Sequence, residues 1–480
     1  MRGFLVSSIG VTCAAALALP LAPPVAAAAL SAAEPATGRT VRSGAYVPGS
    51  TQSLPLAPLT HNRTPGTAEQ GVPRRDVRHF SLVGVVWEDP HTELRGHVQV
   101  RTRATATGTW SGWQELETHN ADHAADPSTP ERASDRVRGA TAPLWVGESD
   151  GVEVRVRAES ISEATEATEA TEAAEAARVA ASPLPTGMRL ELVDPGEGAP
   201  PAAAPGPEEG PRTTTTTATT TTAAMTEESA EAVAASAVNT DVAPLGATEI
   251  PALDRAGTEA ALLALGGADA LTAQQKTKPY VGPRPSITTR RGWGADEKLR
   301  ARKFVYTTKV KAAFVHHSAT GNNYTCKQAP SVIRGIYRYH VNSMGWRDVG
   351  YNFLIDKCGK IYEGRAGGVS KAVLGAHTLG FNSNSMGIAV LGTYTSKKPS
   401  SAAVKAVARL SAWKLGLYGM NPRGKTYLKS GGGNLYGKGK NVRLNVISGH
   451  RDGFATSCPG KKLYDKLGTA RSTAAKYQGR

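Results

Sequence analysis

The chain has 480 residues, more than one compact core usually holds, so two or more domains are expected. It carries 56 Lys and Arg against 41 Asp and Glu, a net charge of +15, and its 51 Gly and 30 Pro exclude a single long helical array. The charge is unevenly divided, because residues 285–480 hold 34 basic and only 7 acidic residues and the part before them is acidic. A basic module favours a polyanionic partner, such as nucleic acid, an anionic membrane or anionic cell-wall polymers.

Residues 1–29 are typical of a secretory signal peptide. One early positive charge is followed by an apolar stretch and then by four alanines at its end. The alternative is an uncleaved membrane anchor, but Pro20, Pro23 and Pro24 interrupt the apolar stretch. Later apolar stretches are shorter than the roughly 18 residues that a spanning helix needs. The sequence therefore predicts a secreted chain with no membrane span after processing, for which nucleic acid is not the expected partner.

Four cysteines are present, and Cys13 lies in the predicted signal peptide. An exported chain meets an oxidising environment, so Cys326, Cys358 and Cys458 suggest one disulfide and one free thiol. A free thiol that an exported protein retains is typical of metal ligation or of nucleophilic catalysis.

The acidic part of the chain divides by composition. Val98 and Val100 alternate with polar residues, which predicts a half-buried strand, and the same alternation recurs further along. A Glu-Ala-Thr repeat interrupts this region and is predicted to be a low-complexity insertion. The predicted segments are a flexible lead-in at 30–76, a β-rich accessory domain at 77–195 with the insertion at 163–177, and a Pro-, Thr- and Ala-rich linker at 196–284.

The basic module, residues 285–480, alternates between strand and helix patterns. Val332, Ile336 and His340 recur four residues apart, which predicts a helix that ends at Gly345. The other predicted elements are strands at 311–315, 386–394 and 445–448, hairpin strands at 351–355 and 360–363, an exposed hairpin at 425–443, and helices from 400 or 401 to 413 and over 461–476. The pattern predicts an α/β domain with a mixed central sheet flanked by helices, within a multidomain chain.

Three side chains of metal-ligand type lie where the predicted sheet would present them. His316 follows one predicted strand, His450 follows another, and Cys458 comes eight residues later. Two imidazoles and a thiolate suit zinc and leave a fourth position for a water, whose pKa zinc would lower. Two alternatives stay open on spacing alone. One is a set of buried core histidines with an inert thiol, and the other is a Cys–His hydrolase with Cys458 as nucleophile.

Several separate motifs in the module resemble those of the peptidoglycan recognition protein family, which includes the type 2 N-acetylmuramoyl-L-alanine amidases. The resemblance covers residues 286–475, and its most recognisable stretch is GWRDVGYNF at 345–353. The other matching stretches, in chain order, are 314–320, 361–365, 375–378, 384–388, 449–452 and 456–460. The segment after Arg365 departs from the animal members, as does the Lys-rich stretch 425–443.

The resemblance implies that His316, His450 and Cys458 hold Zn²⁺. It also implies a catalytic role for Tyr351 and for Thr456, whose hydroxyls could hydrogen-bond the oxyanion of a tetrahedral intermediate. Packing in a strand is the alternative for Tyr351, and a loop cap is the alternative for Thr456.

Three further residues match family positions along the substrate groove. These are His340 and His377, for which core packing is the alternative, and Arg365, which would meet a substrate carboxylate or form a structural ion pair.

Cys326 follows the first strand of the module and Cys358 lies in the next hairpin, so these two are predicted to form the disulfide.

The resemblance and the residues together predict a secreted, cell-wall-associated zinc amidase that cleaves between the lactyl group of muramic acid and L-alanine. The presence of Cys458 favours hydrolysis, because members that only bind peptidoglycan typically lack it. The alternatives are a noncatalytic peptidoglycan-binding module and a Cys–His peptidase that acts on the stem peptide. Muramyl peptides are the expected partner, anionic wall polymers are a further candidate, and a monomer is expected.

Overall fold

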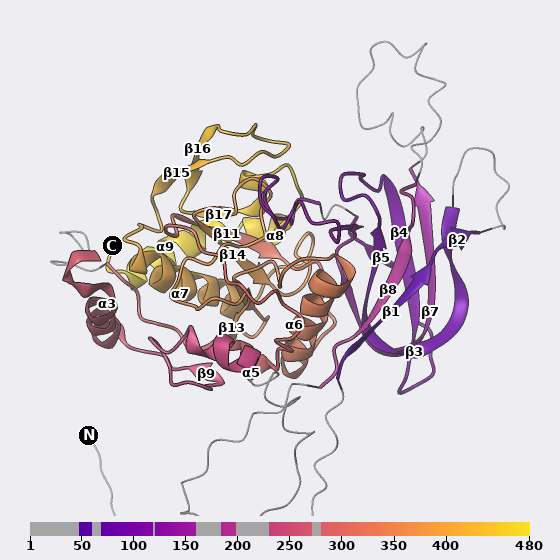
Figure 1. The fold of residues 1–480 in the computed structure, drawn as a ribbon, viewed down its shortest axis with the longest axis horizontal. Helices are drawn as coiled ribbons and strands as arrows, with labels where there is room; N and C mark the ends of the chain where they lie inside the picture. The colour runs from indigo at the N-terminus through magenta and orange to yellow at the C-terminus, as the bar shows by residue number, and fades with distance from the viewer. Residues whose placement is uncertain (1–47, 60–68, 119–120, 160–183, 198–229, 271–279) are drawn as a thin grey trace, which may run out of the picture. The chain divides into compact units, whose positions relative to one another are not determined.

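The computed structural model describes residues 48–59, 69–118, 121–159, 184–197, 230–270 and 280–480. These residues belong to one compact unit, Tyr46–Arg480, in which a β domain is followed by an α/β domain (Figure 1). The predicted signal peptide and the insertion at 163–177 lie outside the described residues. Within the described part, no helix combines the length and the apolarity that crossing a bilayer requires.

The β domain is built on one sheet, which confirms the predicted β-rich character. In the described residues this sheet has the order β1-β8-β3-β7-β4-β5, with β2 and β6 also paired to β3. Val98 and Val100 of β4 are fully buried while the residues between and beside them are partly exposed, as their alternation predicts. The strands are β1 Ser50–Pro55, β2 Ala57–Pro58, β3 Glu69–Trp87, β4 Gly96–Ala104, β5 Gln114–Leu116, β6 Gly139–Ala140, β7 Leu144–Ala158 and β8 Arg189–Asp194.

The prediction of a flexible lead-in over 30–76 is wrong for its second half. β1, β2 and the first part of β3 lie there. β1 pairs antiparallel with β8 along its whole length, from Ser50 opposite Asp194 to Pro55 opposite Arg189. This edge strand is held by backbone hydrogen bonds and is mostly only half-buried, so it needs no apolar periodicity and gives none to detect.

The α/β domain contains the predicted mixed sheet, whose order in the described residues is β17-β11-β14-β12-β13-β10-β9. β11 runs parallel to β14 and β17, whereas β12 and β13 form the predicted antiparallel hairpin. The strands are β9 Glu249–Ile250, β10 Ile287–Thr288, β11 Ala312–His317, β12 Phe353–Ile355, β13 Ile361–Glu363, β14 Ser385–Val390 and β17 Ile447–Gly449, and a separate hairpin joins β15 Lys425–Lys429 to β16 Asn441–Asn445.

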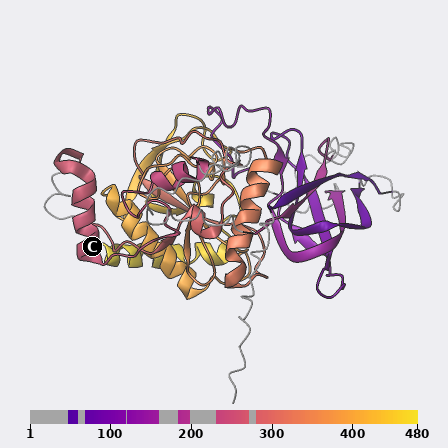
Figure 2. The ribbon, with the colours of Figure 1, turned by 60° about the horizontal axis from the view of Figure 1, so that its bottom comes forward.

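Helices cover this sheet, and one of them begins at a capping residue that the sequence indicates. Ser400 caps the helix α7, because its hydroxyl accepts a hydrogen bond of 3.0 Å from the backbone nitrogen of Ala403. The closing segment forms two helices instead of the one predicted, and the longer, α9, packs beside α7 (Figure 2). The helices are α3 Arg255–Ala270, α5 Arg290–Trp293, α6 Ala329–Arg338, α7 Ser401–Leu417, α8 Lys461–Tyr464 and α9 Leu467–Tyr477.

The predicted linker at 196–284 is also partly ordered, which corrects the sequence analysis. It contains β9 and α3, and β9 extends the central sheet by pairing with β10. The side chain of Asn239 donates a 2.9 Å hydrogen bond to Glu363 and accepts one of 2.8 Å from the backbone of Val369. These tertiary contacts order a stretch whose small and polar composition suggested none.

The predicted helix at 328–344 forms α6 and continues as a π-helical turn, Tyr339–Ser343. α6 lies between the central sheet and the β domain (Figures 1 and 2). The phenol of Tyr339 donates to the carbonyl oxygens of Val85 and Thr141 in the β domain, at 3.3 and 3.1 Å. Gly84 permits this close approach, because a Cβ at that position would lie 2.3 Å from the Tyr339 hydroxyl. The two domains therefore share a packed contact.

Candidate metal centre

The three predicted ligands come together at one edge of the central sheet. β11 ends with His316 and His317, and His450 comes directly after β17. Because β11 and β17 are parallel neighbours, with Val315 opposite Gly449, their carboxyl ends meet at the same edge. The His316 and His450 ring centroids are 4.5 Å apart, and the Sγ of Cys458 is 3.8 Å from the Nδ1 of His316. All three side chains are fully buried.

A fourth residue, His123 of the β domain, completes the cluster. Its Nε2 lies 3.5 Å from the Sγ of Cys458, and its ring centroid is 4.5 Å from that of His450. Its other nitrogen, Nδ1, is 2.9 Å from a carboxylate oxygen of Asp122. The ligand atoms of His123, His316, His450 and Cys458 all lie within 4.8 Å of one another.

This arrangement suits a metal ion. Neighbouring ligands of a tetrahedral zinc are separated by roughly 3.3–3.6 Å, given Zn–N near 2.0 Å and Zn–S near 2.3 Å. The two measured separations that involve Cys458, 3.5 and 3.8 Å, are close to this range. Among the described residues, neither ring nitrogen of the fully buried His450 makes a hydrogen bond, and its Nδ1 lies 3.8 Å from a carboxylate oxygen of Asp122. A buried imidazole without hydrogen bonds is costly unless a metal takes its lone pair.

The electrostatics of the cluster favour neutral imidazoles. Burial, followed by the neighbouring histidines, lowers the pKa of His316 well below its usual value and that of His450 to about 3. Neutral rings can offer lone pairs to a metal. Burial also raises the pKa of the Cys458 thiol well above its usual value. A bound divalent cation would reverse that shift by stabilising the thiolate.

The predicted catalytic tyrosine lies beside the cluster. The ring centroid of Tyr351 is 5.5 Å from that of His316 and 5.9 Å from that of His123. Burial, followed by the charges of Cys458 and Asp122, raises the pKa of the Tyr351 phenol well above its usual value. The phenol therefore keeps its proton over the working pH range and can donate a hydrogen bond.

The other predicted catalytic residue, Thr456, lies in the loop before Cys458. Its hydroxyl accepts a 3.1 Å hydrogen bond from the backbone nitrogen of Cys458, which matches the loop-cap alternative. Its catalytic role stays a prediction.

The two predicted groove histidines are both buried. The Nδ1 of His340 accepts a 3.1 Å hydrogen bond from the backbone of Gly350, and its ring lies 4.5 Å from that of Trp346. Both nitrogens of His377 contact hydroxyls within the domain, at 3.0 and 3.4 Å. These contacts favour the packing alternative for His377, whose ring lies directly behind His316 at a centroid distance of 5.3 Å.

Arg365, the predicted partner of a substrate carboxylate, is paired inside the protein. Two of its guanidinium nitrogens donate to the two carboxylate oxygens of Glu131, at 2.9 and 2.8 Å. Burial would raise the pKa of Glu131, but the charge and hydrogen bonds of Arg365 outweigh it and the pKa is lowered. Glu131 belongs to the β domain, in the same connection as His123.

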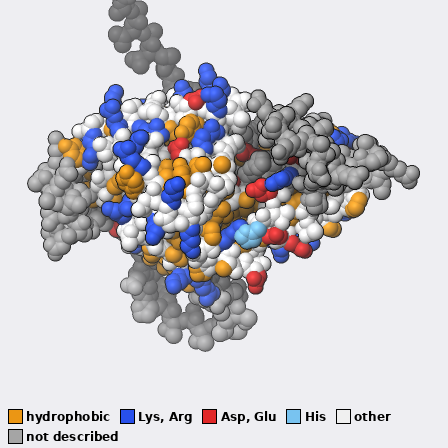
Figure 3. Space-filling model, turned by 90° about the horizontal axis from the view of Figure 1, so that it is seen from above, with side chains coloured by type: hydrophobic (Ala, Val, Ile, Leu, Met, Phe, Trp, Pro, Cys, Tyr) orange, Lys and Arg blue, Asp and Glu red, His pale blue; other side chains and the backbone are white. Residues whose placement is uncertain are grey.

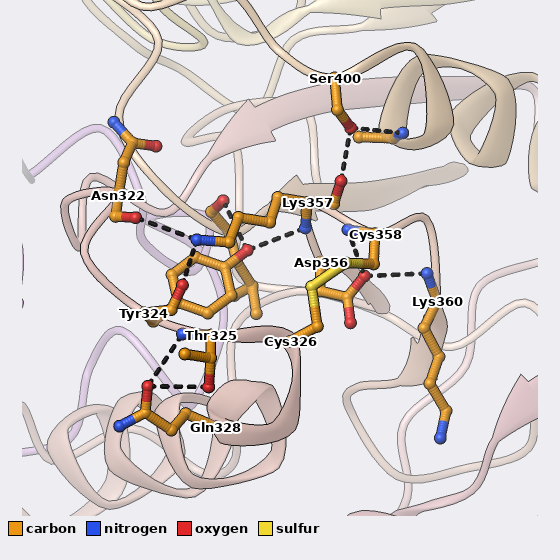
Figure 4. The surroundings of a disulfide bond; sticks show 12 residues. Asn322, Tyr324, Thr325, Cys326, Gln328, Asp356, Lys357, Cys358, Lys360 and Ser400 are labelled. Atoms are coloured by element: carbon orange, nitrogen blue, oxygen red, sulfur yellow. Dashed lines mark hydrogen bonds between the residues drawn. A yellow bond between two sulfur atoms is a disulfide. The ribbon is translucent and has the colours of Figure 1, made fainter.

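The predicted disulfide between Cys326 and Cys358 is confirmed (Figure 4). It ties the turn before α6 to the turn of the β12–β13 hairpin, and Cys458 is the free cysteine of the described residues. The hairpin turn is fixed further by Asp356, whose carboxylate accepts 2.9 Å hydrogen bonds from the backbone nitrogens of Cys358 and Lys360. The cross-link therefore stabilises the start of α6, and Cys458 remains available as a metal ligand.

Comparisons with known proteins agree with the site. A family described as N-acetylmuramoyl-L-alanine amidase matches residues 306–461, and one described as Rv3811 N-terminal galactose-binding domain-like matches residues 35–181. Peptidoglycan-recognition protein SC2 of Drosophila simulans is 30% identical over 186 residues, which are 38% of this chain and 85% of that protein. The N-acetylmuramoyl-L-alanine amidase of Homo sapiens is 30% identical over 200 residues, 40% of this chain and 29% of the human protein.

Among solved structures, Drosophila peptidoglycan recognition protein SA has 25% sequence identity and a TM-score of 0.31, with 38% of this chain and 91% of that chain covered. The match over residues 306–461 places the α/β domain in the amidase class. The chain belongs to the peptidoglycan recognition protein and type 2 N-acetylmuramoyl-L-alanine amidase family. This membership supports a role in recognising peptidoglycan or in hydrolysing its amides.

Sequence reasoning missed Asp122, His123 and Glu131. They lie between β5 and β6 in a stretch with neither helix nor strand periodicity. A carboxylate directly before a histidine was the one local signal, and it is too common to indicate a metal ligand by itself. Their partners are hundreds of residues away in the sequence, 335 for the pair of His123 and Cys458.

Proposed function

We propose that the α/β domain is a zinc-dependent N-acetylmuramoyl-L-alanine amidase, which hydrolyses the amide between the lactyl group of muramic acid and L-alanine in peptidoglycan. The observation that carries this proposal is the convergence of His316, His450 and Cys458 in one buried cluster beside Tyr351. The amidase family that matches the domain supports this substrate class.

The residues of the cluster and Tyr351 make different chemical contributions to the proposed reaction. His316 and His450 are kept neutral by burial and offer nitrogen lone pairs, while Cys458 offers a thiolate. When bound, zinc supplies Lewis acidity toward the amide carbonyl and activates water as the nucleophile. The protonated Tyr351 phenol donates a hydrogen bond to the oxyanion that develops on the carbonyl oxygen.

Export to the cell wall belongs to the same proposal, because peptidoglycan lies outside the membrane. Recovery of the chain from culture medium with an amino terminus near residue 30 would support it, and retention of an intact signal sequence would contradict it.

Lys and Arg side chains are spread over the face seen in Figure 3. The β15–β16 hairpin adds exposed Lys425, Lys429 and Arg443, which suit anionic wall polymers.

Analysis of the products released from purified cell walls tests the proposed reaction. We expect new amino-terminal alanine when the zinc-loaded protein is incubated with peptidoglycan, and none with His450→Ala. His123 lies among the ligand atoms and Glu131 pairs with Arg365. The assay is therefore run on the full chain and on its His123→Ala/Glu131→Ala variant, which removes both contacts. Wall binding with no release by either protein would favour a noncatalytic binding module. New amines from within the stem peptide would instead favour a peptidase with Cys458 as nucleophile.

A further inference from the structure

The connection between β5 and β6 is long, and its described part, residues 121–138, lacks regular structure and is drawn in dark purple in Figure 1. This part contacts Leu379 and Asn382 of the α/β domain. The strands at its two ends hold it to the β-domain sheet, because β5 pairs with β4 and β6 pairs with β3. Long irregular connections inside compact domains are usually functional.

One residue of this segment adds a fourth ligand-type side chain to a cluster in which a hydrolytic zinc site would keep one position open. Catalytic zinc typically has three protein ligands and a fourth position for water, whereas four protein ligands make a closed site. His123 is a fourth ligand-type side chain, with its Nε2 3.5 Å from the Sγ of Cys458. The carboxylate of Asp122 contacts the opposite ring nitrogen at 2.9 Å, as in the carboxylate–histidine pairs that orient metal ligands.

The backbone around His123 is bonded to the α/β domain. The carbonyl oxygen of Asp122 accepts a 2.9 Å hydrogen bond from the backbone nitrogen of Leu379. The side-chain amide of Asn382 donates to the carbonyl oxygen of Ala124 at 2.8 Å and to the carboxylate of Asp126 at 2.7 Å. Buried hydrogen bonds of this kind fix the segment in one position over the metal centre.

Further along, Glu131 pairs with Arg365, for which the sequence leaves both a substrate carboxylate and a structural ion pair open. Its carboxylate makes the bidentate contact with Arg365 and also accepts a 3.1 Å hydrogen bond from the backbone nitrogen of Arg347. Glu131 and Arg365 are only 7% and 8% exposed, so solvent does not weaken this pair. A substrate carboxylate could reach Arg365 only after Glu131 has left.

The segment also packs beside Tyr351, because the His123 ring lies edge-on to the Tyr351 ring at a centroid distance of 5.9 Å. Ala124 and Ala125 belong to the same hydrophobic cluster as Tyr351, which is only 4% exposed. A muramyl peptide that places its scissile carbonyl at the metal would meet the docked segment beside Tyr351.

From these contacts we propose that residues 121–138 form an inhibitory segment, in which His123 is a fourth metal ligand and Glu131 blocks Arg365, so that the amidase is latent until the segment is displaced. The latency rests on the proposed amidase function, whereas the closed four-ligand centre does not. An equilibrium in which the docked form predominates would reduce the rate of hydrolysis in proportion to the small fraction of molecules that are open.

Cobalt substitution tests whether the centre is closed, with imidazole as an added ligand. We expect the visible spectrum of the cobalt-loaded full chain to be unchanged by imidazole, because its fourth position is filled. His123→Ala should respond, because imidazole can enter the vacated position. His97→Ala/Glu115→Ala is the matched control, since it removes an exposed His–Glu pair from the same domain and should behave as the parent. Should His123→Ala fail to fold, His123→Asn keeps a polar group beside Asp122.

Hydrolysis of cell walls tests the latency itself. We expect His123→Ala/Glu131→Ala to release amino-terminal alanine at least tenfold faster than the full chain, and added imidazole to slow the variant but not the parent. A parent cobalt spectrum that responds to imidazole as the variant does would overturn the closed centre. Loss of metal by His123→Ala to the extent seen with His450→Ala would overturn the inhibitory role. If the spectra behave as expected but neither protein releases alanine, the closed centre is supported and the amidase function is rejected.

Discussion

Replacing Cys458 by serine in the His123→Ala background is expected to lower the zinc content from about one ion per molecule to near zero while the fold is retained. A hydroxyl is a much poorer zinc ligand than a thiolate, and only the imidazoles of His316 and His450 then remain to hold the ion. Cys458 is fully buried and serine has nearly the same volume, so the packing around it changes little. Metal analysis after dialysis against a weak chelator, together with circular dichroism, measures both outcomes.

The matched control is Cys326→Ser/Cys358→Ser, which makes the same chemical change at the disulfide. It should lower the free energy of unfolding by about 2–4 kcal/mol, because it opens a closed loop of the chain, but it should keep zinc. Zinc bound by Cys458→Ser with the affinity of the parent would show that the thiolate is not a ligand.

Replacing Tyr351 by phenylalanine is expected to lower turnover by about 10²–10³ with zinc content unchanged. Removal of one hydrogen-bond donor to a developing oxyanion typically has an effect of this size. The change is made in the His123→Ala/Glu131→Ala background, so that release of the segment does not limit the rate. Phenylalanine keeps the ring, so the packing of Tyr351 in its hydrophobic cluster is preserved.

The control for this change is Tyr362→Phe. Tyr362 is a second buried tyrosine, on β13. Its hydroxyl donates a 2.9 Å hydrogen bond to Asp356 in the hairpin turn, and not to any of the four metal-ligand side chains. Its loss should reduce stability by about 1 kcal/mol and leave turnover at the parent rate. If Tyr351→Phe hydrolyses cell walls as fast as its background, Tyr351 is a packing residue and its assigned catalytic role is wrong.

Much of the α/β domain could be predicted because its signals are local. The apolar stretch before His316, the Ser400 cap of α7 and the hairpin around Cys358 each predict an element that the structure contains. The convergence of His316 and His450 follows from their places at the ends of strands, once those strands are parallel neighbours. The family motifs supplied the remaining information, namely that Cys458 lies beside these two histidines.

The rest depends on contacts between distant parts of the chain, which leave no local pattern. β1 is stabilised by backbone pairing with β8, whose residues lie between 134 positions (Pro55 and Arg189) and 144 positions (Ser50 and Asp194) further along the chain. The stretch around Asn239 is ordered by Glu363. His123 meets Cys458 only because the β domain packs on α6. Its sequence neighbourhood would be equally compatible with a solvent-exposed loop.

X-ray absorption at the zinc edge of the full chain is the sharpest test of the closed metal centre, because one spectrum reports all the ligands together. We expect one sulfur at about 2.3 Å and three nitrogens at about 2.0 Å, with His123→Ala replacing one nitrogen by an oxygen from water. A ligand shell without sulfur would contradict the assignment of Cys458 and with it the metal centre. A shell of one sulfur, two nitrogens and an oxygen in the full chain would contradict closure by His123.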